Sequence, residues 1–283
     1  MTKKIKTIVD LRDELTETRK LKKKISLVPT MGNIHEGHLS LIKNAQKQSD
    51  YVVVSIFVNP TQFVAGEDFN EYPRTLDSDI ELISKLNVNL VFIPEAIELY
   101  PMNNKISTEV SIPELESIYC GKHRPGHFRG VAMIVSKLFN IVQPDIAIFG
   151  EKDYQQLLII RSLVKNLFLP IEIISLPTVR EASGLAMSSR NNYLTEPERQ
   201  KAPMLYECIK TTVNLIINGA KDYEKLEREA KLFLEKAGFK IEYYNICDSE
   251  TLGPVQGKIL VVLAAVWLGK TRLIDNATVH TYD

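Results

Sequence analysis

Two histidines, His35 and His38, lie three residues apart in the segment PTMGNIHEGHLSLI, residues 29–42. Imidazoles at this spacing can bind a metal ion, lie as incidental polar groups, or donate hydrogen bonds to a phosphate. A zinc site would need a third ligand, and no cysteine lies nearby in the sequence. The choice between these interpretations depends on the elements that carry the segment.

The segment joins an apolar run at 25–29, which predicts a strand, to a helical pattern that begins near Gly37. Ligands of open α/β sheets bind beyond the carboxyl ends of the strands, and Gly32 and Gly37 allow tight turns there. We expect His38 to open the helix, whose first N–H groups and dipole attract anions. Glycine, histidine and a helix start after a strand therefore favour a phosphate site.

Strand-like and helical patterns alternate through the first two thirds of the chain. The expected strands cover 25–29, 51–58, 89–93, 145–150 and 171–176, and the expected helices cover 10–24, 37–48, 75–86, 131–142 and 153–168. The run at 51–58 is β-branched without polar alternation, which is typical of a strand buried on both faces. The pattern predicts right-handed βαβ units in a Rossmann-like open parallel sheet with helices on both faces.

The pattern changes after about residue 179. Two charged helical stretches, near 196–218 and 222–237, precede strand-like runs at 240–246, 258–266 and 272–279. We expect a first domain over residues 1–178 and a smaller α+β domain over 179–283, with the boundary set by Pro177.

The composition excludes several classes of protein. The 283 residues include 35 Lys+Arg and 35 Asp+Glu, whereas a nucleic-acid binder normally carries a basic excess. The cysteines, Cys120, Cys208 and Cys247, suit neither a disulfide framework nor a C-x-x-C metal site, which predicts a reducing, cytoplasmic location. The first 24 residues show no signal-peptide pattern, and the longest apolar run, 259–268, is too short to span a bilayer.

Six segments together resemble a known family. They are, in chain order, HEGH (35–38), SIFVNPTQF (55–63), YPRTLDSD (72–79), RPGHFRGV (124–131), FGEKDYQQ (149–156) and REASGLAMSSRN (180–191). HEGH resembles the H-I-G-H element of the adenylyl-transferring superfamily, and the full set resembles the pantothenate synthetases, or pantoate–β-alanine ligases. The later part of the chain adds only LIDN at 273–276.

The resemblance implies an ATP-dependent, AMP-forming ligase. The carboxylate of (R)-pantoate would attack the α-phosphorus of ATP and release pyrophosphate, and the amine of β-alanine would then attack the pantoyl adenylate and release AMP. The expected cofactor is Mg²⁺ that arrives with ATP, and no zinc, haem or flavin is expected. The expected partners are these small molecules and a second copy of the chain in a homodimer, without nucleic acid or membrane.

The resemblance also assigns residues to the nucleotide. His35 and His38 would contact the reacting phosphate, and His38 inherits the family's label of proton donor. Lys152 would neutralise phosphate charge, because a lysine at a helix start opposes the helix dipole unless an anion lies between them. The other expected ATP contacts are Met31, Gly32, Gly150, Asp153, Val179 and Met187.

The segment MSSR resembles the K-M-S-K-S loop of the synthetases. Ser188 and Ser189 would offer hydroxyls to phosphate oxygens, and Arg190 would offer its planar guanidinium. Its position just past the expected boundary suits a closing element, so the smaller domain would close over the active site.

The remaining assignments concern the acid, the amine and the metal. Gln62 and Gln156 would bind pantoate, and Asn59 would bind the amine substrate. Arg124 would pair with the carboxylate of β-alanine or a phosphate, with a structural role in its Pro-Gly loop as the alternative. The candidates for an apolar wall around the geminal methyls of pantoate are Pro29, Met31 and Phe63, and the candidate for a direct Mg²⁺ ligand is Asp79.

Two rival functions stay open from the sequence. One is another adenylyl-transferring nucleotidyltransferase of the same superfamily, which would not need the two glutamines as a pair. The other is a catalytically silent nucleotide-binding sensor, which would need binding groups without donors at the reaction centre.

Overall fold

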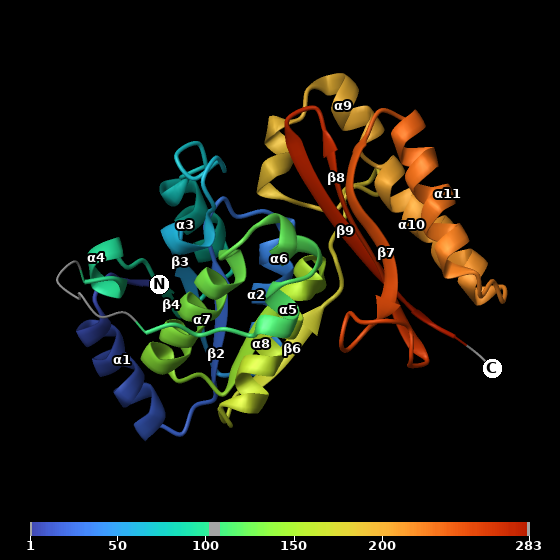
Figure 1. Cartoon of the computed structure of the whole chain (residues 1–283). Helices are drawn as coiled ribbons and strands as arrows, with labels where there is room; N and C mark the ends of the chain where they lie inside the picture. Colours follow the sequence, from blue (N-terminus) through green and yellow to red (C-terminus); the bar gives the residue numbers. More distant parts are fainter. Residues whose placement is uncertain (1, 102–107, 282–283) are drawn as a thin grey trace. The chain divides into compact units, whose positions relative to one another are not determined.

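The computed structural model describes residues 2–101 and 108–281 (Figure 1). The chain divides into two compact units. The first unit contains Met1–Glu151 and Gln156–Pro177, and the second contains Lys152–Gln155 and Thr178–Asp283. Residues Lys152–Gln155 therefore belong by their contacts to the second unit, although the chain on either side of them belongs to the first.

The first unit is built on a six-stranded parallel sheet with the strand order β1-β4-β3-β2-β5-β6. The strands are β1 (Lys3–Ile5), β2 (Ile25–Thr30), β3 (Tyr51–Ile56), β4 (Leu90–Phe92), β5 (Ile146–Gly150) and β6 (Glu172–Leu176). All six residues of β3 are buried, as its β-branched sequence predicts.

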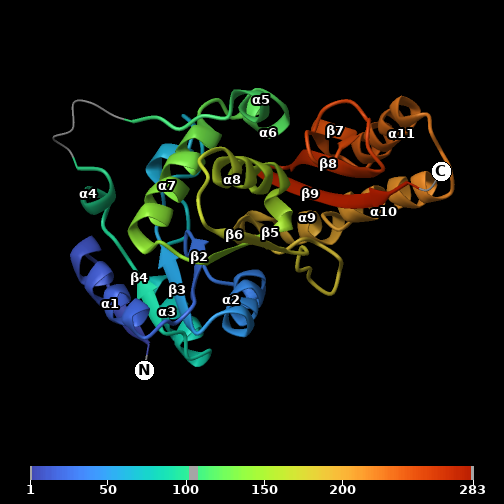
Figure 2. The ribbon, with the colours of Figure 1, turned by 90° about the horizontal axis from the view of Figure 1, so that it is seen from below.

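Helices cover both faces of this sheet (Figure 2). On one face lie α2 (Glu36–Gln48) and α3 (Leu76–Lys85), and on the other lie α1 (Ile8–Lys20), α7 (His127–Val142) and α8 (Tyr154–Asn166). Ile42 of α2 and Ile83 of α3 pack with Val28 and Val54 of the sheet in one apolar core. The expected Rossmann-like open sheet is confirmed.

Short elements connect the larger ones. They are η1 (Pro60–Gln62), α4 (Ala96–Leu99), α5 (Pro113–Glu116), α6 (Tyr119–His123) and η2 (Glu151–Asp153). Among residues 2–101 and 108–281, no helix combines the length and apolar character needed to cross a membrane.

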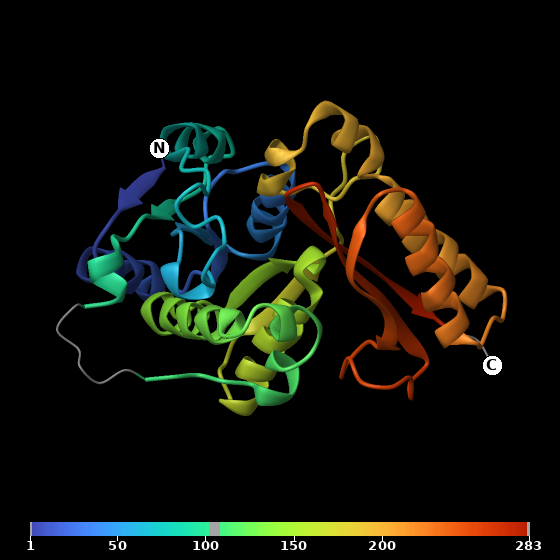
Figure 3. The same cartoon turned by 45° about the horizontal axis from the view of Figure 1, so that its top comes forward.

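The second unit pairs helices with an antiparallel sheet, which confirms the expected α+β class. The sheet has the order β7-β8-β9, with β7 (Lys240–Asp248), β8 (Ile259–Leu268) and β9 (Thr271–His280). Helices α10 (Met204–Ile217) and α11 (Tyr223–Lys236) lie side by side against the sheet (Figure 3). The hairpin at 180–186, η3 (Ser189–Tyr193) and α9 (Glu196–Lys201) precede them.

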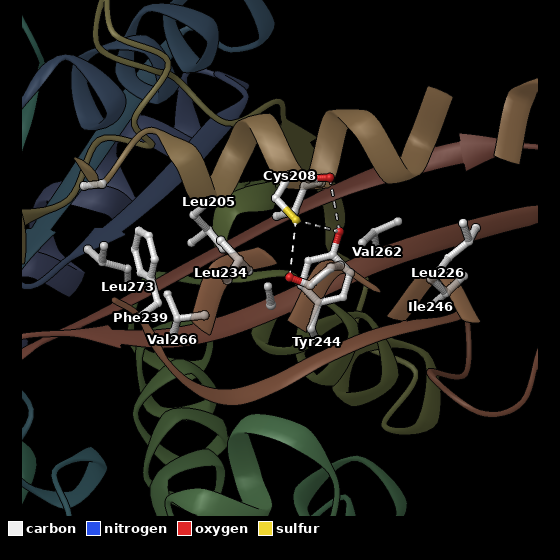
Figure 4. Close-up of a cluster of buried hydrophobic side chains, with 14 of the residues drawn as sticks. Leu205, Cys208, Leu226, Leu234, Phe239, Tyr244, Ile246, Val262, Val266 and Leu273 are labelled. Carbon is white, nitrogen blue, oxygen red and sulfur yellow. Dashed lines mark hydrogen bonds between the residues drawn. The ribbon is translucent and has the colours of Figure 1, made fainter. Parts of the chain in front are cut away.

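The hydroxyl of Tyr244 is a polar group buried in the apolar core of the second unit (Figure 4). Leu205, Leu234 and Val262 surround it as part of one apolar cluster. The Tyr244 hydroxyl lies 2.6 Å from the Thr212 hydroxyl oxygen and fixes β7 against α10. Burial raises the pKa of Tyr244 above the usual range, so the phenol is neutral at physiological pH.

One strand was not expected from the sequence, and one expected helix was wrong. The strand β1 was missed because three residues are too few to show a pattern. The single helix expected at 196–218 is two helices, α9 and α10, because Pro203 lacks the N–H that would continue the hydrogen-bond ladder.

Candidate active site

The loop between β2 and α2 is held by one buried carboxylate, that of Asp79 on α3. Its Oδ2 accepts a hydrogen bond from the Asn33 N–H at 2.9 Å, and its Oδ1 accepts one from the Ile34 N–H at 2.8 Å. The Thr75 hydroxyl donates to Oδ1 at 3.1 Å. A Cβ at Gly32 would lie 2.9 Å from Oδ2, and its φ of +81° is left-handed, so this loop requires glycine there.

His35 and His38 cap the start of α2 with their own side chains. His35 Nδ1 accepts a hydrogen bond from the Gly37 N–H at 3.2 Å, and His38 Nδ1 accepts one from the His35 N–H at 3.4 Å. The helix therefore begins at Glu36, not at His38 as expected, because the imidazole of His35 serves as the N-cap acceptor. The two ring centroids lie 4.1 Å apart.

This capping fixes where each ring carries its proton. A neutral imidazole accepts through one nitrogen and donates through the other. Because Nδ1 accepts in both His35 and His38, the proton of each neutral ring lies on Nε2. Two Nε2–H donors therefore lie beside the N-terminus of α2, where the helix dipole also favours an anion.

The side chains considered as metal ligands make other contacts in the structure. Within the described ranges 2–101 and 108–281, no three or more His, Cys, Asp or Glu side chains are grouped to hold a metal ion. The lone pair of Nδ1 is engaged by a backbone N–H in both His35 and His38. The contacts of Asp79 to the Asn33 and Ile34 N–H groups and to the Thr75 hydroxyl favour a structural role for this carboxylate, and the metal-ligand role stays a prediction.

Three residues expected to bind substrate lie together in the first unit. Gln62 Nε2 donates to Met31 Sδ at 2.9 Å, and Asn59 Nδ2 donates to Gln62 Oε1 at 3.1 Å. Asn59 is 1% exposed, and it also donates to the Gly130 carbonyl and accepts from the Tyr100 hydroxyl. These contacts orient the Gln62 amide through Asn59, and the expected role of Asn59 in binding the amine substrate stays a prediction.

The other apolar candidates lie in different surroundings. Pro29 is half-buried in β2 and pairs in register with Ser55 of β3. Phe63 packs edge-on against Phe69 and Tyr72, with centroid distances of 5.2 and 5.7 Å. Phe63 thus belongs to an aromatic cluster that follows η1.

Arg124 is part of a network that ends on Gln62. Its Nε and Nη2 donate to the two carboxylate oxygens of Glu67, with the Nη2 contact at 2.8 Å. Its Nη1 lies 2.9 Å from His127 Nε2, which must accept because a guanidinium only donates. His127 Nδ1 then donates to the Gln62 carbonyl at 2.6 Å. These contacts favour the structural alternative for Arg124 over a pairing with substrate.

The GEKD segment joins β5 to α8. Gly150 ends β5, where it pairs in register with Leu176. The side chain of Lys152 is 20% exposed, and its Nζ lies 4.0 Å from Asp153 Oδ2. Gln156 lies in the first turn of α8 and is half-buried.

The MSSR segment follows the hairpin at 180–186 in the second unit. The Met187 N–H donates to the Val179 carbonyl at 2.9 Å, so two expected nucleotide contacts lie side by side. Ser188 Oγ accepts from the Arg190 N–H at 3.3 Å, and Ser189 is 8% exposed. The Ser188 hydroxyl therefore shapes the turn that carries Arg190.

Comparison with known proteins decides the family. The family described as pantoate-beta-alanine ligase matches residues 3–278. The chain belongs to the pantoate–β-alanine ligase family. A relative named pantothenate synthetase from Hahella chejuensis is 51% identical over 98% of both chains, and one from Pseudomonas savastanoi pv. phaseolicola is 50% identical over 96% of this chain and 97% of its own.

Solved structures of this ligase family have the same fold. A pantothenate synthetase from Thermus thermophilus superposes with a TM-score of 0.91 at 40% identity, over 98% of this chain and 99% of its own. A pantoate–β-alanine ligase from Francisella tularensis, described as complexed with beta-gamma ATP and β-alanine, has a TM-score of 0.79 at 36% identity, over 98% of this chain and 97% of its own. The chain is thus an ATP-dependent ligase of pantothenate biosynthesis.

Glu67 carries no signal in the sequence, and Asp79 makes contacts other than the one its sequence position predicts. Glu67, the partner of Arg124, lies 57 positions away from it in a stretch without a motif. Asp79 was singled out, but for a metal instead of for the loop at 32–34. A signal for its role existed: an acidic residue on the buried side of a helix requires donors, and a glycine loop supplies backbone N–H groups.

Proposed function

We propose that the chain joins (R)-pantoate to β-alanine through a pantoyl adenylate, with the histidine pair of α2 facing the reacting phosphate. The observation that carries this proposal is the pair of Nε2–H donors at the start of α2. Donors held in advance at the position of developing charge are the main way in which enzymes speed phosphate chemistry.

In the first step a carboxylate oxygen of pantoate attacks the α-phosphorus of ATP. A C–O–P bond forms, the bond to the β-phosphate oxygen breaks, and pyrophosphate leaves. His35 and His38 donate hydrogen bonds to the oxygens on which negative charge increases, and Lys152 supplies a positive charge. The half-buried site of Lys152 makes its charge more effective than that of an exposed lysine.

In the second step the amine of β-alanine attacks the acyl carbon of the adenylate. An amide bond forms, the acyl–oxygen bond breaks, and AMP leaves with the carboxylate oxygen of pantoate. The attacking amine loses a proton as the amide forms. The enzyme contributes chiefly by holding the amine near the acyl carbon.

Gln62 is the residue that we assign to pantoate with the most structural support. Its amide is buried and oriented by Asn59 on one side and Met31 on the other. An amide can bond the hydroxyl and carboxylate of pantoate without adding charge, and Met31 offers an apolar surface to the methyl groups. We assign Gln156 to pantoate on the resemblance alone.

Ser188, Ser189 and Arg190 are proposed to meet the phosphates when the smaller domain closes. The guanidinium of Arg190 suits phosphate oxygens, and the Ser188 cap presents the turn that carries it. Closure would exclude water from the adenylate, which hydrolyses if water reaches it.

Magnesium is proposed to enter with ATP. Mg²⁺ neutralises phosphate charge and is held largely by phosphate oxygens and water in such sites. The oxygens of Asp79 accept hydrogen bonds from the Asn33 and Ile34 N–H groups and from the Thr75 hydroxyl, which supports a structural role for this residue. No step in this account depends on a protein ligand for the metal.

We also propose that the chain acts as a homodimer in the cytoplasm. The dimer follows from the resemblance to its family. The cytoplasm is supported by Cys120, Cys208 and Cys247, which are buried cysteines that form no disulfide with one another. Light scattering of the purified protein tests the dimer.

The experiment that tests the reaction follows one oxygen atom. Pantoate labelled with ¹⁸O in its carboxylate is incubated with ATP, Mg²⁺ and β-alanine, and the nucleotide product is analysed by mass spectrometry. The proposal predicts AMP that carries the label. Unlabelled AMP would exclude the adenylate, ADP would indicate an acyl phosphate, and adenylate without amide formation would favour the rival nucleotidyltransferase.

A further inference from the structure

The dipeptide Asp275–Asn276, in the LIDN segment of β9, is buried without belonging to the proposed reaction centre. Asp275 is 4% exposed and Asn276 is 6% exposed. Successive side chains of a strand point to opposite faces, so the two residues reach different neighbours. A carboxylate and an amide at such positions need hydrogen-bonding partners, and the second unit supplies them.

Asp275 holds the hairpin that leads into MSSR. Arg180 donates from Nη1 and Nη2 to the two carboxylate oxygens at 2.6 and 2.9 Å. The same guanidinium donates to the Gly184 carbonyl, and its central carbon lies 3.2 Å from the centroid of the Tyr206 ring. Arg180 also forms a bridge with Ala186, directly before Met187, so its pairing fixes the start of the segment.

Asn276 holds the backbone of Lys152. Its Nδ2 donates to the Lys152 carbonyl at 2.9 Å. Nearby in the sequence, the Tyr154 hydroxyl donates to the Ser249 carbonyl at 2.9 Å. These bonds join the segment Lys152–Gln155 to other residues of the second unit, to which it belongs.

We propose that Asp275 and Asn276 are positioning residues that hold the two phosphate-binding segments of the second unit, Lys152 and MSSR, at a fixed spacing. The inference rests on the proposed function of those segments. Neither residue touches a substrate in this account. Substitution of either residue should slow adenylate formation, because a displacement of about 1 Å in a group that stabilises a transition state can slow a reaction about 100-fold.

The test compares Asn276→Ala with the matched control Thr278→Ala, an exposed residue on the same strand. The measured quantities are the kcat and KM of pantoate-dependent exchange between pyrophosphate and ATP, the KM for β-alanine, and Tm. We expect Asn276→Ala to lower the exchange kcat about 10-fold with the KM for β-alanine unchanged. Thr278→Ala should behave as wild type.

A second variant covers the case in which the alanine variant fails to fold. Asn276→Asp has the same shape but places a carboxylate against the Lys152 carbonyl, so it should lower the exchange kcat at least as much. Asp275→Asn, which weakens the paired hydrogen bonds with Arg180, should also lower the exchange kcat. Unchanged exchange in folded Asn276→Asp and Asp275→Asn would overturn the proposal.

Lys152→Ala separates this inference from the proposed function. A loss of exchange in Lys152→Ala together with a normal rate in Asn276→Ala would overturn the positioning role alone. Normal exchange in Lys152→Ala would remove Lys152 from the reaction and the inference with it. A loss in both, with Thr278→Ala unaffected, supports both.

Discussion

The loop at 32–34 and the hairpin at 180–186 are each held by a carboxylate distant in sequence, but the carboxylates hold different atoms. Asp79 accepts from the backbone N–H groups of Asn33 and Ile34. Asp275 accepts from the side chain of Arg180. The first arrangement fixes the path of the chain itself, and the second fixes it through a long side chain.

This difference suits the different tasks proposed for the two segments. The histidine pair must present donors in one geometry throughout the reaction, and hydrogen bonds between Asp79 and the backbone of the loop provide this. A segment that closes over ATP must be held firmly in one state and still be able to move, which side-chain pairs allow more readily. The comparison predicts that substitutions around the histidines affect turnover more than those around MSSR.

The largest effect is expected for His38→Ala. Removal of one donor to developing charge typically lowers kcat roughly 100- to 1000-fold. Ser188→Ala removes a cap of the turn and should lower kcat about 10-fold by comparison. Steady-state kinetics of AMP release measures kcat for both variants. A larger loss of kcat in Ser188→Ala than in His38→Ala would contradict the prediction that the histidine loop matters more for turnover than MSSR.

A smaller but clear effect is expected for Asp79→Asn. The amide keeps the shape of the side chain but turns one acceptor into a donor that faces a backbone N–H. We expect the free energy of unfolding to fall by roughly 2 kcal/mol and kcat to fall about 10-fold. Urea unfolding and AMP release measure these changes.

Asp77→Asn is the matched control for Asp79→Asn. Asp77 lies in the same first turn of α3 and is exposed. Its substitution should change neither quantity. Equal effects of the two substitutions would show that charge at the helix start matters and the loop contact does not.

A modest effect is expected for Arg199→Ala. Arg199 donates from Nη2 to both oxygens of Glu181 at 2.9 Å, but its side chain is 42% exposed. Pairs with this exposure contribute at most about 1 kcal/mol, so the KM for ATP should rise about 2- to 5-fold. Arg228→Ala, on the exposed side of α11, is the control. A 100-fold loss of kcat would mean that the hairpin is as critical as the histidine loop.

No change in kinetics is expected for Tyr244→Phe. The substitution leaves the Thr212 hydroxyl without its 2.6 Å partner, which should cost about 1 kcal/mol of unfolding free energy. Calorimetry measures the stability, and AMP release measures the activity. A change in kcat would link the core of the second unit to the reaction.

The same core predicts a pH dependence of stability. Burial raises the pKa of the Cys208 thiol, so the folded protein keeps this proton at a pH at which the unfolded chain loses it. The contribution of Cys208 is therefore present below the ordinary thiol pKa and is lost as pH rises above it. Urea unfolding across alkaline pH should show a smaller decline in Cys208→Ala than in wild type.

The sequence predicts the parallel sheet well because βαβ units have strong local patterns. The runs at 25–29 and 51–58 and the helix that follows HEGH are examples, since apolar period and glycine placement act over a few residues. Contacts that depend on the tertiary fold are a different case. Nothing local indicates that Glu67 meets Arg124, or that Asn276 meets the backbone of Lys152.

The start of α2 also combines a feature that the sequence predicts with one that it does not. Glycine and histidine after a strand indicate the start of a helix, but the choice of His35 as the cap depends on the side-chain conformation of an imidazole. The capping then determines the tautomer, which no sequence pattern contains.

Exchange of labelled pyrophosphate into ATP, with pantoate present and β-alanine absent, tests the central claim most directly. The adenylate account predicts that wild-type protein catalyses this exchange and that His38→Ala lowers its rate roughly 100-fold or more while the protein remains folded. Exchange that requires β-alanine, or that proceeds at a normal rate in His38→Ala, would contradict the claim that the histidines of α2 act on the reacting phosphate.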